Sequence, residues 1–260
     1  MADRAIRLLT LDDATMVSPN IRRLRFSGAS LTSFPSGFEG GYVKLLFDAE
    51  GRALETDDAS VRPAARRSYT VRAVDPEART LTLEAALHTV PGGRLGPATR
   101  WVATAQPGAR IAVMGPGPVK RLSPDADHVV AVADPTGLAA LAVNLEVLPA
   151  TARGFAIVEV LAEGDRRDLE RPEGVDVQWV VSATPRDGTS ALIQRLVAAP
   201  WPSGRVSFWG AGEFEVVREM RRYVLERGVQ PEDLYLSSYW KRGATDEQHK
   251  LAKKQAAATA

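Results

Sequence analysis

The chain of 260 residues contains no cysteine. It can therefore form no disulfide, hold no metal ion through thiolates, use no thiol nucleophile and ligate no iron–sulfur cluster of the all-cysteine kind. We expect no resident metal site. If this protein carries out redox chemistry, a bound organic cofactor has to supply it.

The sequence also lacks an excess of charge of either sign. With 33 basic and 32 acidic residues its formal net charge is +1, so no field of the whole protein attracts nucleic acid or an anionic membrane. Its longest apolar runs, such as 129–133 and 138–143, are too short to cross a bilayer, and its first residues do not resemble a secretory signal. We therefore expect a cytoplasmic protein that binds neither nucleic acid nor membrane, and its polar composition favours a monomer.

The first half of the chain, residues 6–114, consists of short segments with alternating apolar and polar residues, separated by Gly, Pro and Asp. This pattern predicts a small antiparallel β-barrel. One hairpin is nearly explicit, because Tyr69–Val74 and Thr80–Leu87 flank a turn that starts with Asp75-Pro76.

From His128 onward, nearly continuous apolar runs alternate with segments of helical periodicity, which is typical of a parallel sheet covered on both faces. The strand-like runs are 129–133, 155–161, 177–181, 206–209 and 234–237. The sequence further predicts Thr189 as the N-cap of one intervening helix and Gly228 as the end of another. The second half is therefore expected to be an α/β domain.

The boundary between the halves is expected in residues 115–121, where Pro and Gly dominate and no element should run through. This divides the chain into a barrel domain of residues 1–120 and an α/β domain of residues 121–244. Residues 245–260 form a separate tail, in which Thr245 and Gln248 fit a capping box at the start of a Lys- and Ala-rich helix. That helix could lie on the preceding domain or point into solvent.

A barrel followed by an α/β domain is the layout of the ferredoxin-reductase group of flavoproteins, and Arg67-Ser68-Tyr69-Thr70 resembles the Arg-x-Tyr-Ser/Thr signature of its FAD-binding strand. Alternate strand residues point the same way, so Arg67 can grip the FAD pyrophosphate while the Tyr69 ring covers the isoalloxazine. Thr70 would lie near the N5 and O4 edge of the flavin. Taken alone, the motif also fits ordinary exposed residues of a barrel strand.

A more specific resemblance begins at Glu84. The segments 84–88, 96–101 and 105–108 resemble a run found in the siderophore-interacting protein family. Residues 96–99 would begin a short helix whose free N–H groups face the FAD pyrophosphate, with the Thr99 hydroxyl adding a contact. The resemblance implies cofactor contacts from His88, Gly96, Pro97, Ala98, Thr99 and Trp101, with Tyr239 or Trp240 covering the flavin face. His88 also fits an ordinary strand residue.

Further segments match the family in the same order, so that the resemblance covers residues 17–243. They are 115–117, 133–140, 211–213 and 239–243. The chain departs from the family pattern at Pro135, Gly137 and Lys241, which leaves NADH, NADPH and ferredoxin open as electron donors.

No Gly-x-Gly-x-x-Gly fingerprint follows a strand, so an ordinary Rossmann dinucleotide site is not indicated. NAD(P)H would instead bind at the carboxyl ends of two strands. The residues expected there are Asp134, Thr136, Gly210, Gly212 and Glu213. These residues also suit a pair of tight turns.

The resemblance implies FAD-dependent reduction of a ferric siderophore, with electrons from NAD(P)H and release of ferrous iron. Because electron transfer requires proximity, we expect no general acid or base. A local cluster of basic residues would attract the anionic ferric complex; its candidates are Lys44, Lys120 or Arg121, and Lys241 or Arg242. Two alternatives stay open: a flavin electron-transfer protein with ferredoxin as partner, and a non-catalytic siderophore carrier.

Overall fold

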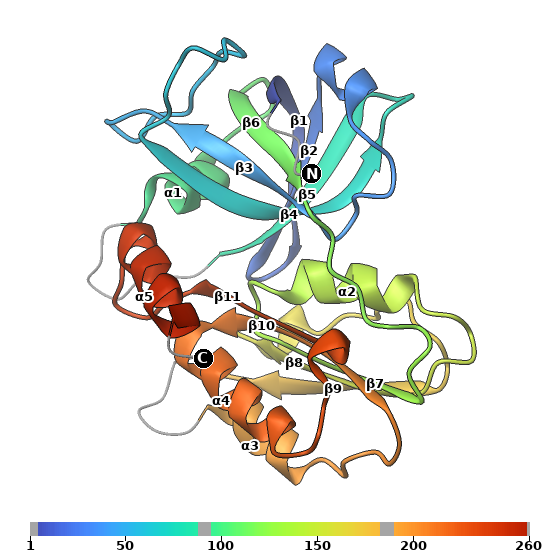
Figure 1. The fold of residues 1–260 in the computed structure, drawn as a ribbon. Helices are drawn as coiled ribbons and strands as arrows, with labels where there is room; N and C mark the ends of the chain where they lie inside the picture. The colour runs from blue at the N-terminus through green and yellow to red at the C-terminus, as the bar shows by residue number, and fades with distance from the viewer. Residues whose placement is uncertain (1–4, 88–94, 183–189, 259–260) are drawn as a thin grey trace. The chain divides into compact units, whose positions relative to one another are not determined.

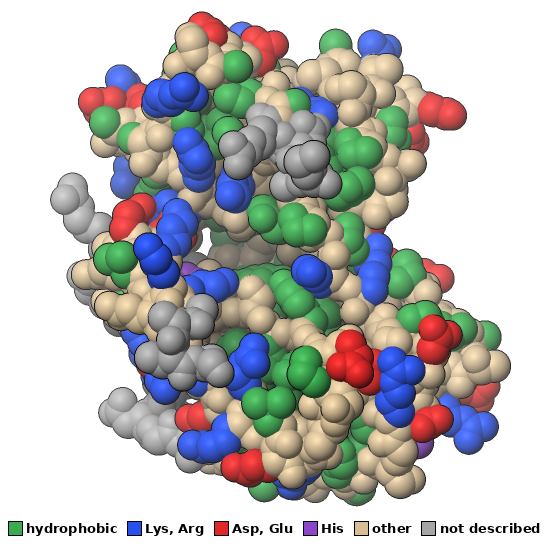
Figure 2. Space-filling model, in the orientation of Figure 1, with side chains coloured by type: hydrophobic (Ala, Val, Ile, Leu, Met, Phe, Trp, Pro, Cys, Tyr) green, Lys and Arg blue, Asp and Glu red, His purple; other side chains and the backbone are tan. Residues whose placement is uncertain are grey.

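The computed structural model describes residues 5–87, 95–182 and 190–258. It divides into two compact units, residues 1–120 and 121–260, and each is considered by itself. Figure 2 shows both basic and acidic side chains on the visible surface. Among the residues described, no helix combines the length and the apolar character needed to cross a bilayer.

The first unit is a closed barrel of six antiparallel strands in the order β1-β2-β5-β4-β3-β6 (Figure 1). Its elements are β1 (Ile6–Ser18), β2 (Ile21–Ser27), the short 3-10 helix η1 (Ala29–Ser33), β3 (Tyr42–Phe47), β4 (Ala65–Asp75), β5 (Thr80–Ala86), α1 (Pro97–Thr104) and β6 (Arg110–Gly117). The predicted barrel is confirmed. The β4–β5 hairpin is confirmed as well: Asp75 pairs with Thr80, and its side chain accepts a 2.8 Å hydrogen bond from the Ala78 amide in the turn.

Alternation along the strands fills the barrel. On β3, Val43, Leu45 and Phe47 point inward and are fully buried. Helix α1 packs on the same core through Ala98 and Val102. Burial of apolar side chains is the main source of stability for such a unit, and it holds α1 against the barrel.

Within the expected boundary segment 115–121, the prediction that no element runs through is wrong for the first three residues, because β6 continues through Gly115-Pro116-Gly117. The strand tolerates this proline because the β3–β6 register shifts here: Gly115 and Pro116 of β6 lie opposite the single residue Val43 of β3, and proline without its N–H fits such a bulge. Gly117 is required as well, because a Cβ there would lie 2.2 Å from the Tyr42 ring.

The second unit is a parallel five-stranded sheet in the order β11-β10-β7-β8-β9. Its strands are β7 (His128–Ala133), β8 (Gly154–Val160), β9 (Val175–Val181), β10 (Val206–Glu213) and β11 (Leu234–Trp240). All five apolar runs in the sequence are therefore strands, and the predicted α/β architecture is confirmed.

Helices cover both faces of this sheet (Figure 1). They are α2 (Leu138–Glu146), α3 (Ala191–Ala198), α4 (Phe214–Leu225) and α5 (Asp246–Ala258), with the short 3-10 helices η2 (Glu163–Asp165) and η3 (Pro231–Asp233). Helices α3 and α4 share one apolar cluster with Val130 and Val132 of β7 and with Ile157 of β8. Residues of even number on β7 and odd number on β8 therefore face α3 and α4.

The helix ends partly follow the sequence signals. The N-cap of α3 is Ser190, whose hydroxyl accepts from the Leu192 amide at 3.2 Å, whereas Thr189 lies outside the described residues. At the end of α4, Gly228 has φ +78°, and the Val229 amide donates to the Val224 carbonyl at 3.2 Å. This is the Schellman arrangement that a glycine after a helix favours, so Gly228 ends the helix as expected.

The C-terminal helix α5 lies on the second unit. The capping box is confirmed, because Thr245 and Gln248 exchange side-chain-to-backbone hydrogen bonds of 2.7 and 3.3 Å. His249 is buried and its Nε2 lies 2.9 Å from the Ser238 hydroxyl on β11, while Lys253 donates to the Ser238 carbonyl at 3.0 Å. Of the two orientations left open by the sequence, docking on the sheet is the one observed.

Candidate functional site

In the first unit, Arg67 and Tyr69 lie on the inward face of β4. Their register partners on β3 are Leu45 and Val43, which are fully buried, so all four side chains share that face. Tyr69 packs against the barrel core and Arg67 is half-buried. Burial raises the pKa of the Tyr69 hydroxyl above its usual value, and the nearby Arg67 charge opposes that rise. The phenol is thus neutral.

Helix α1 begins where the sequence motif predicts. Gly96 is its N-cap in an extended conformation, and Pro97 occupies the first turn, where its missing N–H costs no hydrogen bond. The first N–H groups of a helix have no intrahelical acceptor, so this end suits a phosphate. Among the residues that the structure describes, no atom lies within 4 Å of a Cβ built at Gly96. Thr99, in the first turn, is half-buried.

The other described residues predicted to contact FAD do not lie on the inward face of β4: some pack in the barrel unit, and two lie on the outer face of β4. Ala98 is buried in the barrel core, and the Trp101 ring stacks on Phe26 with centroids 6.2 Å apart. Thr70 is buried and Ser68 exposed on the outer face of β4. His88 lies outside the described residues.

Sequence reasoning missed Arg22, which positions α1. Its guanidinium is buried and donates to the carbonyls of Val102 and Ala105 at 2.6 and 2.8 Å. A cation is favoured at a helix C-terminus, where carbonyls lack partners. Arg22 occupies a place in β2 where the inside–outside alternation gives no signal for such a role.

The basic candidates of the first unit do not share the face of Arg67 and Tyr69. Lys44 lies opposite Ser68, and therefore on the outer face of the strand pair. Its Nζ is 5.8 Å from the centre of the Tyr42 ring. Lys120 is exposed at the end of this unit, and Arg121, the first residue of the second unit, is half-buried.

In the second unit, four of the five candidate nucleotide residues lie where the parallel strands end, at the carboxyl edge of the sheet: Asp134, Thr136, Gly212 and Glu213. The chain passes from β7 to β8 and β9 on one side and returns to β10 and β11 on the other, so neighbouring strands β7 and β10 diverge at a topological switch point. Ligands of open α/β sheets bind outside the carboxyl ends of strands at such a point. Asp134 follows β7 directly and Glu213 ends β10, so both stand at that point.

Asp134 is buried, and its carboxylate organises the edge. One oxygen accepts from the Thr136 amide and hydroxyl at 2.8 and 2.6 Å, and the other accepts from the Trp240 indole at 2.7 Å. Burial raises the pKa of Asp134, while these hydrogen bonds oppose the rise. Gly212 has φ +156°, and a Cβ there would lie 2.8 Å from the Asp134 carboxylate. Trp240 is therefore held at the edge by its indole N–H.

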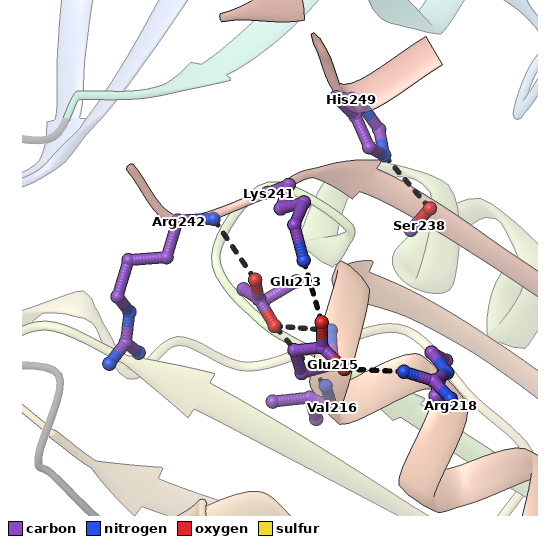
Figure 3. Close-up of polar contacts among 8 residues, drawn as sticks. All are labelled: Glu213, Glu215, Val216, Arg218, Ser238, Lys241, Arg242 and His249. Atoms are coloured by element: carbon purple, nitrogen blue, oxygen red, sulfur yellow. Dashed lines mark hydrogen bonds and ion pairs between the residues drawn. The ribbon is translucent and has the colours of Figure 1, made fainter. Parts of the chain in front are cut away.

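Glu213 joins two elements at the same edge (Figure 3). It is the N-cap of α4: one oxygen accepts from the amides of Glu215 and Val216 at 2.6 and 3.2 Å. Its other oxygen accepts from the Arg242 amide at 3.0 Å, which fixes the chain just beyond β11. Gly210, in contrast, lies inside the sheet, since a Cβ there would meet Leu236 and Met220.

Lys241 and Arg242 differ in what surrounds them. The Lys241 ammonium forms a 2.6 Å ion pair with Glu215 and lies 4.4 Å from the centre of the Phe214 ring. Glu215 also pairs with Arg218 at 3.0 Å (Figure 3). The Arg242 side chain is exposed and extends away from these groups. Tyr239 is half-buried on β11.

Sequence reasoning also missed Glu159, near the end of β8. Burial, together with the neighbouring Asp134 charge, raises its pKa to about 7, while a hydrogen bond from Ser182 and the charge of Arg242 oppose the shift. A partly buried carboxylate that titrates near neutrality is a candidate functional group. Its signal in the sequence is one acidic residue in an otherwise apolar strand.

The barrel and the parallel α/β sheet define this chain as a two-unit protein of the ferredoxin-reductase fold. The fold is shared with the ferredoxin reductase of carbazole 1,9a-dioxygenase, with a TM-score of 0.62, 15% identity, and coverage of 91% of this chain and 67% of that one. Residues 10–120 of the present chain match the family model of a siderophore-interacting FAD-binding domain.

The chain belongs to the siderophore-interacting protein family, whose model matches residues 126–243. The crystal structure of SipS from Aeromonas hydrophila is 34% identical, with a TM-score of 0.85 and coverage of 97% and 98% of the two chains. Ferric vibriobactin reductase of Vibrio cholerae is 28% identical over 252 residues, 93% of this chain and 91% of its own length. The NADPH-dependent ferric-chelate reductase of Escherichia coli is 24% identical over 249 residues, 92% and 94% of the two lengths.

Proposed function

We propose that this protein reduces ferric siderophores through bound FAD, with a nicotinamide nucleotide as the electron donor. The observation that supports this most is local: in the FAD-binding unit, the inward face of β4 and the exposed start of α1 present the groups an FAD requires. FAD, when bound, accepts a hydride and passes on electrons singly, which links a two-electron donor to the Fe(III)/Fe(II) couple. Ferrous iron is held less tightly by hard oxygen ligands, so reduction releases it.

In this proposal, Arg67 and the first turn of α1 hold the FAD pyrophosphate. Removing a charge-assisted phosphate contact costs about 1.5 to 3 kcal/mol, so Arg67→Ala should weaken FAD binding roughly tenfold or more. Fluorescence titration of the apoprotein with FAD measures this. Arg66→Ala is the matched control, because Arg66 is the exposed neighbour on the other face of β4. Equal FAD affinity in both variants would remove Arg67 from the site.

The donor, in this proposal, binds at the switch point formed by Asp134, Thr136, Gly212 and Glu213. Support comes from the strand order and from the position of the first two residues directly after β7. Stopped-flow reduction of the bound flavin by NADH, NADPH and reduced ferredoxin tests the assignment. Reduction by ferredoxin alone would replace the nicotinamide donor with a protein partner.

For the anionic ferric siderophore, the surroundings of the C-terminal basic pair favour Arg242 over Lys241. The Lys241 charge is already compensated by Glu215 at 2.6 Å, whereas the Arg242 side chain is exposed. We expect Arg242→Ala to raise the KM for an anionic ferric siderophore severalfold and to leave reduction of a neutral acceptor unchanged, with Lys241→Ala as the matched control. Raising the ionic strength should reduce the difference in KM between Arg242→Ala and the wild type. Equal loss with both acceptors would instead assign Arg242 to the fold.

A further inference from the structure

The position of Glu159 in the sheet is one from which an acidic side chain can contact the ribose of a bound dinucleotide. Strands β7 and β8, with α2 between them, form the first βαβ unit of the sheet, and Glu159 lies near the carboxyl end of its second strand. In dinucleotide-binding βαβ units, an acidic residue in that place accepts hydrogen bonds from the ribose 2′-hydroxyl. Here the place is occupied by an acidic side chain although the glycine fingerprint of such units is missing.

Glu159 also lies on the side of the sheet where the switch-point residues are. Ala133 pairs with Val158, so the next residues along, Asp134 and Glu159, follow on the same face of adjacent strands. Glu159 is half-buried, so part of its side chain is exposed. The groups acting on it come from three other elements: Asp134 after β7, Ser182 after β9 and Arg242 after β11.

We propose that Glu159 selects a nicotinamide donor without a 2′-phosphate, because its carboxylate accepts a hydrogen bond from the ribose 2′-hydroxyl and repels a phosphate there. The proposal rests on the donor site assigned above. Of the charged groups that act on Glu159, the Asp134 carboxylate also disfavours a 2′-phosphate, and the Arg242 guanidinium opposes it. The preferred donor is therefore NADH, in contrast to the relative from Escherichia coli, whose name specifies NADPH.

The pKa of about 7 adds a second signature. Above pH 7 the Glu159 carboxylate is ionised and repels a 2′-phosphate, whereas below pH 7 it becomes neutral and can donate to one. Preference for NADH over NADPH should therefore fall as the pH falls through 7. A purely structural role for Glu159 would change both nucleotides alike.

Calorimetric titration of the FAD-loaded protein with NAD⁺ and NADP⁺ tests the proposal without turnover. Losing a hydrogen bond to a charged acceptor weakens binding roughly tenfold or more. In the wild type, the dissociation constant for NADP⁺ should exceed that for NAD⁺. We expect Glu159→Gln to lower the ratio of the NADP⁺ constant to the NAD⁺ constant about tenfold at pH 8, toward equal binding. Glu170→Gln is the matched control, because it removes the same charge from an exposed residue between β8 and β9.

Stopped-flow reduction of the flavin by NADH and NADPH between pH 6 and 8, in the wild type and in Glu159→Gln, gives a second test. A preference for NADH that declines below pH 7, and that Glu159→Gln abolishes, supports the proposal. Tighter binding of the phosphorylated nucleotide, or a ratio that Glu159→Gln leaves unchanged while both nucleotides reduce the flavin, overturns it and leaves the donor site intact. Failure of both nucleotides, with reduction by ferredoxin, overturns the donor site and this inference together.

Discussion

Glu213 is the residue whose loss should be most informative about the edge of the second unit. Its carboxylate is buried and accepts three backbone N–H groups, from Glu215, Val216 and Arg242. The first two lie at the start of α4 and the third lies just after β11. A substitution that removes the carboxylate therefore loosens a helix and a strand end at once.

The magnitude follows from these contacts. Replacing an N-cap by alanine costs about 1 kcal/mol, and a further lost hydrogen bond costs about 1 kcal/mol. Glu213→Ala should thus lower the free energy of unfolding of the second unit by about 2 kcal/mol. Glu213→Gln keeps an acceptor oxygen for α4 but loses the charge, so about half of that loss is expected.

Urea unfolding followed by tryptophan fluorescence measures the loss, since four of the five tryptophans lie beyond residue 121. Hydrogen exchange at the amides of Glu215 and Arg242 locates it, and both should exchange faster in Glu213→Ala. A change below about 0.5 kcal/mol, the usual range of surface substitutions, would refute the reasoning. Faster exchange at Glu215 alone would also refute it, because the hydrogen bond from the Arg242 amide to Glu213 would then contribute nothing to stability.

Two further predictions concern positioning residues. Arg22→Met should lower the stability of the first unit by about 2 to 3 kcal/mol, because two buried carbonyls at the end of α1 lose their donor; thermal unfolding measures this, with the exposed Arg25→Met as control. Burial and Lys253 lower the pKa of His249 below 6.5, with Lys241 adding to the shift and Asp246 and Glu213 opposing it. Its contribution to docking of α5 is thus present above pH 6.5 and lost as pH falls through the lowered pKa. Hydrogen exchange of residues 250–256, corrected for intrinsic rates, should rise on acidification, and a pH-independent profile would contradict this.

The architecture was accessible to sequence reasoning because it depends on periodicity. Alternation of apolar residues produced the barrel strands, and the five apolar runs are all strands of the sheet. The prediction that β6 stops before Gly115 was wrong for a local reason. A proline does not fit a regular ladder, but the bulge that β6 forms opposite Val43 of β3 provides a place where no N–H is needed.

The site was only partly accessible, because motifs show which residues are present and not which partners they find. Lys241 and Arg242 are equivalent by charge in the sequence, yet only Lys241 has Glu215 within 2.6 Å. Gly210 and Gly212 belong to one motif, but Gly210 makes room for Leu236 inside the sheet while Gly212 makes room for Asp134 at its edge. Pairing of this kind depends on strand register, which no single motif specifies.

The edge of the second unit therefore contains two kinds of polar residue, and they should respond differently to substitution. The carboxylate oxygens of Asp134 and Glu213 accept hydrogen bonds from the protein itself. Asp134 holds Trp240, and Glu213 holds the start of α4 and the chain after β11. Changing either alters the shape of the edge, and every ligand should be affected alike. Arg242 and Glu159 retain exposed surface and opposite charges. Changing one of these should alter recognition of one ligand class only, which is how recognition and structure can be separated by experiment at this edge.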